Sequence, residues 1–281
     1  MAKGERRQID GQRVKSKIKS RNPIIQFDEL QIYMMMPHTI DIEGTEGSIT
    51  VYSPSLGQVI EMGETKFNMG ANPFIANTTM YRLPLWEIGI DWNTFADFDL
   101  FCMLVHAGVD KSVTDILFGA ELDWSKFILC AKHKEDGTEE RILYNEESKI
   151  EINETVYFHL SQYIRKVLMR NPEEKITNDP VLKQWYISKD KREKANNEWR
   201  EENGEEMHVS MQSLISACLN HPGFKYKRKE LLDVGINEFY DSVKRLQVYE
   251  SSVASLHGAM GGMIDAKKLP KDATNFMREF E

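Results

Sequence analysis

The chain has 281 residues, a net charge of −8 and a hydrophobic content of 41%. This length suffices for one large domain or two modest ones, and the 13 Phe, 10 Tyr and 5 Trp residues provide enough bulk for a core. No apolar run reaches the roughly 18–20 residues that a membrane helix needs, and the first residues lack the apolar stretch of a signal peptide. The three cysteines are far apart, which argues against a disulfide framework, so we expect a cytoplasmic protein.

Charge is distributed unevenly along the chain. Residues 1–21 contain eight Lys or Arg residues against two acidic ones, a net charge of +6, so the remainder must carry −14. We expect residues 1–24 to form a basic N-terminal arm that stays solvated or docks on an acidic surface of its own body or of a neighbouring subunit. Nucleic acid is a less favoured partner, because the arm has no aromatic residue for stacking and the acidic body repels phosphate.

Residues 25–183 are predicted to form an α+β body that is rich in helix. Short strands in a small antiparallel sheet or hairpin are expected at Phe27–Met34, Ile40–Ile42 and Ser48–Tyr52. A helix should begin near Pro54, with Ser53 or Ser55 as its cap. The Asn72-Pro73 and Leu83-Pro84 pairs indicate element boundaries, because a residue before proline disfavours helix.

The second half of this body begins with an aromatic helix. Asp91 or Asn93 is the expected cap of a largely buried helix that contains Phe95–Leu104. Further along, a hairpin, a third strand and an amphipathic helix are predicted at 127–144, 150–152 and 156–168. The pair Asp136-Gly137 is a good former of the hairpin turn.

The last hundred residues are expected to be helical. Residues 184–207 are mostly charged and predict a linker or a solvated helix, in which Trp199 is a candidate anchor for a partner. Residues 208–281 predict an all-helical C-terminal module, with Ser210 capping one helix that stops at 220–223.

A long helix over 236–263 is the clearest prediction in this module. Its apolar residues recur at steps of three and four, which places them in one stripe. The stripe either packs on 211–219 and the body or engages a helical partner. The candidate partner-binding residues are Ile236, Tyr240, Val243, Leu246, Tyr249, Val253, Leu256 and Met260, together with Trp199.

The sequence contains no string typical of catalysis or of a cofactor site. Glycine-rich phosphate loops and nucleophile elbows are missing from it. Two close pairs, Cys102/His106 and Cys130/His133, would supply four zinc ligands only if they met in space. Acidic residues near Trp92 suit helix capping better than magnesium. We therefore expect no enzyme, no metal and no cofactor.

Several segments resemble a family of proteins encoded in the tail-gene clusters of phages and prophages of Gram-positive bacteria. The similarity spans about residues 25–280 and leaves out the basic arm, while the charged segment matches poorly. The segments that carry it are 214–226, 234–250, 257–265 and 274–278, with shorter ones at 60–64, 89–92 and 159–165.

This resemblance implies a role in virion morphogenesis, as a tail assembly chaperone in the host cytoplasm. Such proteins bind the helical tape measure protein and keep it soluble while tail tube subunits polymerise around it. The alternative is a structural component of the virion, such as a neck, baseplate or tail-tip subunit, whose basic arm locks neighbouring subunits. Self-association into a homo-oligomer is left open.

Overall fold

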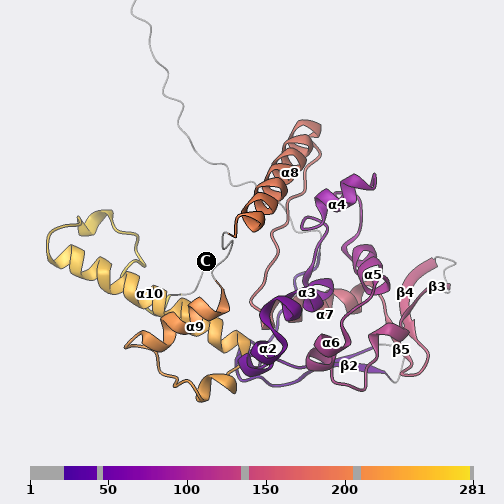
Figure 1. The fold of residues 1–281 in the computed structure, drawn as a ribbon, viewed down its shortest axis with the longest axis horizontal. Coiled ribbons are helices and arrows are strands. Elements are labelled where there is room, and N and C mark those ends of the chain that lie inside the picture. The colour runs from indigo at the N-terminus through magenta and orange to yellow at the C-terminus, as the bar shows by residue number, and fades with distance from the viewer. Residues whose placement is uncertain (1–21, 43–46, 134–138, 205–209, 279–281) are drawn as a thin grey trace, which may run out of the picture.

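The computed structural model describes residues 22–42, 47–133, 139–204 and 210–278. The predictions for the basic arm over residues 1–21 and for the turn at Asp136-Gly137 lie outside these ranges. Figure 1 shows a helix-rich α+β fold with small antiparallel sheets, which confirms the predicted fold class. Its elements are α1 Glu29–Tyr33, β1 His38–Asp41, β2 Ser48–Val51, α2 Leu56–Met62, α3 Glu64–Ile75, α4 Arg82–Glu87, α5 Asp97–Ala107, α6 Lys111–Phe118, η1 Trp124–Lys126, β3 Ile128–His133, β4 Glu139–Asn145, β5 Ile150–Ile152, α7 Glu154–Val167, α8 Pro180–Glu202, α9 Met211–Asn220, η2 Glu230–Leu232, α10 Ile236–Met260 and η3 Ala266–Lys268.

The strands form two separate antiparallel sheets. β1 pairs with β2, placing the buried Ile40 opposite the buried Ile49. β3, β4 and β5 follow one another as the predicted hairpin with a third strand. Both ends of β5, Ile150 and Ile152, are buried against the core, whereas most of β3 is exposed.

The main core lies where α3 packs on α5, α6 and α7. The predicted amphipathic helix is confirmed as α7, whose buried face includes Leu160 and Ile164. Beside it, Trp124 is 2% exposed and packs on the ring of Phe74 at a centroid distance of 4.7 Å. Because each buried aromatic removes a large apolar area from water, this cluster is a major source of stability.

Two predictions of local structure are wrong. The expected strand over Phe27–Met34 is the helix α1, because the Asp28 carboxylate accepts hydrogen bonds from the backbone N–H groups of Leu30 and Gln31. The aromatic helix begins at Asp97, beyond the expected caps. Asp91 instead accepts from the Asn93 backbone N–H at 3.0 Å, which forms a turn before the helix.

The two proline pairs do not end helices. Pro73 lies inside the last turn of α3, where its missing N–H removes one hydrogen bond but the helix continues to Ile75. Pro84 is the third residue of α4, in the first turn, where backbone N–H groups have no partner within the helix.

A second, smaller core joins α4 to α8. Leu83, Leu85, Trp92 and Ile187 are its buried members. The charged segment beyond Ser188 continues as helix to Glu202, and every residue from 191 to 204 is exposed. The predicted boundary between body and charged segment therefore falls inside α8.

The C-terminal helices are joined to the body by backbone hydrogen bonds. Leu56 N–H donates to Val234 O at 2.8 Å, and Ile236 N–H donates to Pro54 O at 2.9 Å. Ser210 caps α9 as predicted, with its hydroxyl accepting from Ser213 N–H. Buried residues of α9, η2 and α10 belong to the main core, so the module and the body share one core.

Candidate protein-binding surfaces

The first half of the predicted apolar stripe is used inside the molecule. Ile236 is 2% exposed, which removes it from any surface that a partner can reach. Tyr240, Val243 and Leu246 are partly buried and pack against the main core. This half of α10 therefore attaches the helix to its own body.

The second half of the stripe remains largely uncovered. Tyr249 is 50% exposed, Leu256 45% and Met260 78%, while Val253 is partly buried. We call the exposed large apolar side chains of this region the distal patch; they are Tyr249, Leu256, Met260, Met263, Ile264, Phe276 and Met277. In Figure 1 this end of α10 projects away from the body.

The C-terminal segment folds back along α10 and completes the distal patch. The Arg245 guanidinium donates to Arg278 O at 3.0 Å, and the rings of Tyr249 and Phe276 meet edge to face with centroids 6.4 Å apart. Ser252 of α10 and Ala273 of the segment are both buried. The distal patch thus consists of one face of α10 and the C-terminal segment that folds back along it.

Trp199 lies on a different part of the molecule. Its side chain is 57% exposed near the end of α8, and α8 and α10 project from the body in different directions (Figure 1). The predicted partner-binding residues are therefore spread over two helices.

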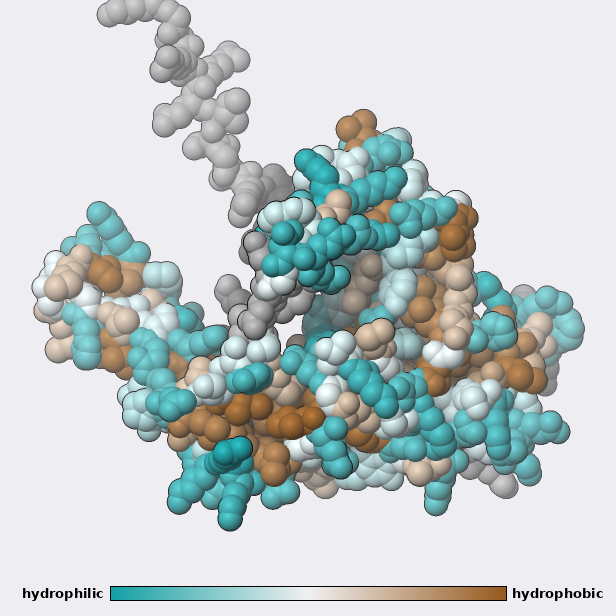
Figure 2. All heavy atoms as spheres, viewed as in Figure 1, coloured by the Kyte–Doolittle hydropathy of each residue, from teal (hydrophilic) through white to brown (hydrophobic). Residues whose placement is uncertain are grey.

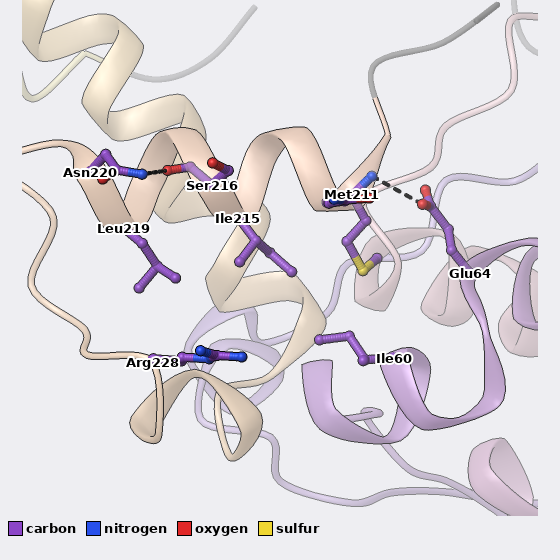
Figure 3. A pocket seen from close by; sticks show the side chains of 9 residues that line it. Ile60, Glu64, Met211, Ile215, Ser216, Leu219, Asn220 and Arg228 are labelled. Carbon is purple, nitrogen blue, oxygen red and sulfur yellow. Dashed lines mark hydrogen bonds between the residues drawn. The ribbon is translucent and has the colours of Figure 1, made fainter.

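A groove that sequence reasoning did not locate separates α9 from the corner between α2 and α3. It encloses about 510 Å³. The apolar part of its lining is Ile60, Met211, Ile215 and Leu219, and the polar part is Glu64, Gln212, Ser216, Asn220 and Arg228. Figure 2 shows hydrophobic side chains gathered along α9 and α2, and Figure 3 shows Ile60 and Ile215 facing each other across the groove.

The two charged residues of the groove stand at opposite ends and differ in their partners. Glu64 accepts a hydrogen bond from Met211 N–H at 3.0 Å, so its carboxylate stabilises the start of α9. Arg228 lies near Leu219 and belongs to an exposed basic turn, 227–229. The sequence shows this turn, but only the fold places it beside Ile60.

The two Cys/His pairs, Cys102/His106 and Cys130/His133, do not form a shared metal site in the described residues. No group of three or more His, Cys, Asp and Glu side chains lies within reach of a shared ion there. Burial raises the pKa of the Cys102 thiol to about 12, which keeps it protonated and a poor metal ligand. His133 lies on exposed β3, where its imidazole is 3.5 Å from the Glu139 carboxylate.

The acidic residues around Trp92 have structural partners. Asp97 accepts hydrogen bonds from Thr78 N–H at 2.7 Å and from the Asn22 amide at 2.8 Å. Asp99 pairs with Arg141 at 2.7 Å, and Asp91 pairs with Lys183. These carboxylates therefore hold the loops and strands around α5 in place.

In the parts of the chain that the structure describes, none of the helices combines the length and the hydropathy needed to cross a lipid bilayer. A scan against protein-family models finds no match for this chain, and searches of curated proteins and of solved structures find no significant match.

Proposed function

We propose that this chain is a non-enzymatic bacteriophage tail morphogenesis protein, a tail assembly chaperone that binds the helical tape measure protein. The observation that supports it best is the distal patch. Seven large apolar side chains stand exposed on one helix and the segment that folds back on it. Exposed patches of this kind are typical of surfaces that bind other proteins.

The composition of the distal patch fits a partner with a long and variable apolar face. Met260, Met263 and Met277 have unbranched, polarisable side chains that adapt to differently shaped surfaces. An apolar stripe of another helix can pack on such a surface by helix-to-helix contact. The acidic body would keep the resulting complex in solution.

The second candidate function is a resident virion subunit in the neck, baseplate or tail tip. The net charge of +6 on residues 1–21 favours it, because a basic segment on an acidic body suits attachment to the acidic surface of a neighbouring subunit. The two functions place the protein differently: a chaperone acts in the host cytoplasm, and a subunit stays in the particle.

Mass spectrometry of purified virions separates the two functions. A chaperone is absent from the particles but co-purifies from infected cells with the tape measure protein. An abundant signal from this chain in the particles would assign it to the structural subunits. Absence from both fractions would contradict both functions.

Variants of the distal patch connect the function to the surface. Met260→Asp with Leu256→Asp should remove co-purification of the tape measure protein, because carboxylates oppose apolar contact. The matched control is Met69→Asp on α3, where the side chain is 72% exposed. If the control and the double variant behave alike, the distal patch is not the binding surface.

A further inference from the structure

The groove between α9 and the α2–α3 corner is distinct from the distal patch and has its own chemistry. We infer that it binds an amphipathic α-helix that carries acidic residues beside its apolar stripe. This inference goes beyond the proposed function, because it concerns a second surface and uses no residue of the distal patch. It therefore stands or fails separately.

The apolar lining calls for an apolar ligand. Ile60 is 45% exposed and Leu219 37% exposed, although both flank a concave surface beside the main core. Ile215, on α9 one turn before Leu219, faces Ile60 of α2 and is partly buried (Figure 3). Covering these side chains would remove apolar area from water at little cost, since the groove is already formed.

The walls of the groove favour a helical ligand over an extended one. Both walls are helices, whose backbone N–H and C=O groups are paired within each helix. An extended peptide would find no sheet edge to pair with and would leave its own backbone groups unsatisfied. A helix satisfies its backbone internally and offers only side chains.

The length of the groove agrees with this choice. Met211, Ile215 and Leu219 are four residues apart on α9, so they span about 12 Å along the helix axis. Apolar residues at positions i, i+4 and i+7 of a partner helix span about 10.5 Å. Two to three turns of a partner therefore match the apolar lining.

Charge complementarity determines which charge the side chains of the partner should carry. In the described part of the chain, the side chains of Lys227, Arg228 and Lys229 have no ion-pair partner. Glu64, the carboxylate in the lining, already accepts a hydrogen bond from α9. That bond leaves the negative charge of Glu64 in place, but Glu64 lies at the opposite end of the groove from Arg228. The charge at the Arg228 end is therefore positive, and carboxylates of a partner helix can pair with Arg228 there.

Charge disfavours one of the other occupants, and shape disfavours another. The basic residues of the N-terminal arm would be repelled by the basic turn. An anionic membrane is flat, whereas the apolar side chains lie in a concave groove. An acidic amphipathic helix matches both the shape and the charge.

Synthetic peptides test the inference on the full chain. The probe is a labelled amphipathic peptide of about 18 residues, long enough to be helical, with leucines on one face and glutamates on the other. Two further peptides replace the glutamates by lysines or place a proline in the centre. Fluorescence anisotropy should give the acidic helix at least about tenfold tighter binding than either, with weakening at higher salt.

Two variants and two matched controls identify the groove. Arg228→Glu should remove the preference for the acidic peptide, and Leu219→Asp should remove binding of all three. Arg192→Glu and Leu182→Asp on α8 are the controls, the latter with the same 37% exposure as Leu219. Circular dichroism establishes that each variant is folded, and exposed Arg228 keeps the test available if Leu219→Asp unfolds the chain.

Four results would overturn the inference. Equal binding of the acidic and basic helices, or a preference that survives Arg228→Glu, removes the charge argument. Binding to phosphatidylserine vesicles but not to peptide, lost in both groove variants, assigns the groove to a membrane. Self-association in sedimentation that Leu219→Asp abolishes assigns it to a second copy of this chain.

Discussion

The Nε2 atoms of His38 and His159 lie 3.1 Å apart, and this contact joins β1 to α7. The His38 ring also stacks on the Tyr163 ring, with centroids 4.2 Å apart, and it meets the Phe27 ring in a T-shaped contact. One imidazole must donate and the other accept, which requires that at least one of them is neutral. The pair therefore links folding to protonation.

We predict that the protein loses stability as the pH falls below about 6.5, the ordinary pKa of histidine. Burial lowers the pKa of both imidazoles, and the charge of His38 lowers that of His159 further. The unfolded chain then binds protons that the folded chain does not, so protonation favours unfolding until the pH lies below the folded pKa values. Urea unfolding between about pH 5 and 8 measures this slope.

The variant His159→Gln should flatten the pH dependence, because it removes one titrating ring from the pair. His106→Gln is the control, since His106 is exposed on α5. A slope that is the same in the wild type and in His159→Gln would show that other groups cause the acid sensitivity.

A second prediction concerns the attachment of α8 to α4. The Arg82 guanidinium binds both carboxylate oxygens of Asp190, and the two side chains are only 11% and 15% exposed. Asp190→Ala leaves a buried cation without its partner, which should cost about 3–5 kcal/mol if the contact stays closed. We therefore expect α8 to separate from α4, with faster hydrogen exchange in both helices.

The control for this prediction is on the same helix. Glu193 forms an exposed pair with Lys189 at 3.4 Å, so Glu193→Ala should change stability by less than about 0.5 kcal/mol. Replacing Arg82 and Asp190 together by Met and Leu should restore the attachment. Equal exchange in Asp190→Ala and Glu193→Ala would mean that the ion pair does not hold α8.

Local signals in the sequence predicted the starts of α2 and α9, where Ser55 and Ser210 accept hydrogen bonds from backbone N–H groups three residues further on. Ser55 and Gln58 form a reciprocal cap, with Ser55 N–H donating to Gln58 at 2.8 Å. The segment Phe27–Met34 was wrongly predicted as a strand, because its apolar residues alternate as they do in a strand. Leu30 and Met34 are in fact exposed on a short helix whose start depends on Asp28.

The candidate surfaces were only partly accessible to sequence reasoning, for a physical reason. Helical spacing predicts that the residues from Ile236 to Met260 share a face, but not which part of that face another element covers. The body covers the first half, and the distal patch is what remains. The groove depends on Ile60 and Ile215 meeting across the fold, which no periodicity records.

A third prediction tests the contact of α3 with α6. A Cβ atom on Gly70 would lie 2.5 Å from Val113 Cγ2, and Val113 is fully buried. Gly70→Ala should therefore destabilise the protein by about 1–3 kcal/mol, even though alanine favours helix. Thr65→Ala, an exposed change on the same helix, should have little effect on urea unfolding.

A double-mutant cycle gives this prediction its sharper form. Val113→Ala removes the methyl groups that obstruct the new Cβ, so Gly70→Ala should cost less in that background. Additive effects of the two substitutions would show that α3 and α6 do not meet at this point.

The last prediction tests whether the C-terminal segment covers α10. Ser252 is 3% exposed, and its hydroxyl has no hydrogen-bond partner among the described residues. Leaving a buried hydroxyl unsatisfied costs about 1–3 kcal/mol, so Ser252→Ala should raise the stability by about 1 kcal/mol. Exposed Ser251→Ala, on the same helix, should gain only the few tenths that come from helix propensity. Thermal unfolding compares the two. Equal gains would mean that water reaches Ser252, and the returning segment would then not be packed on the helix that carries the distal patch.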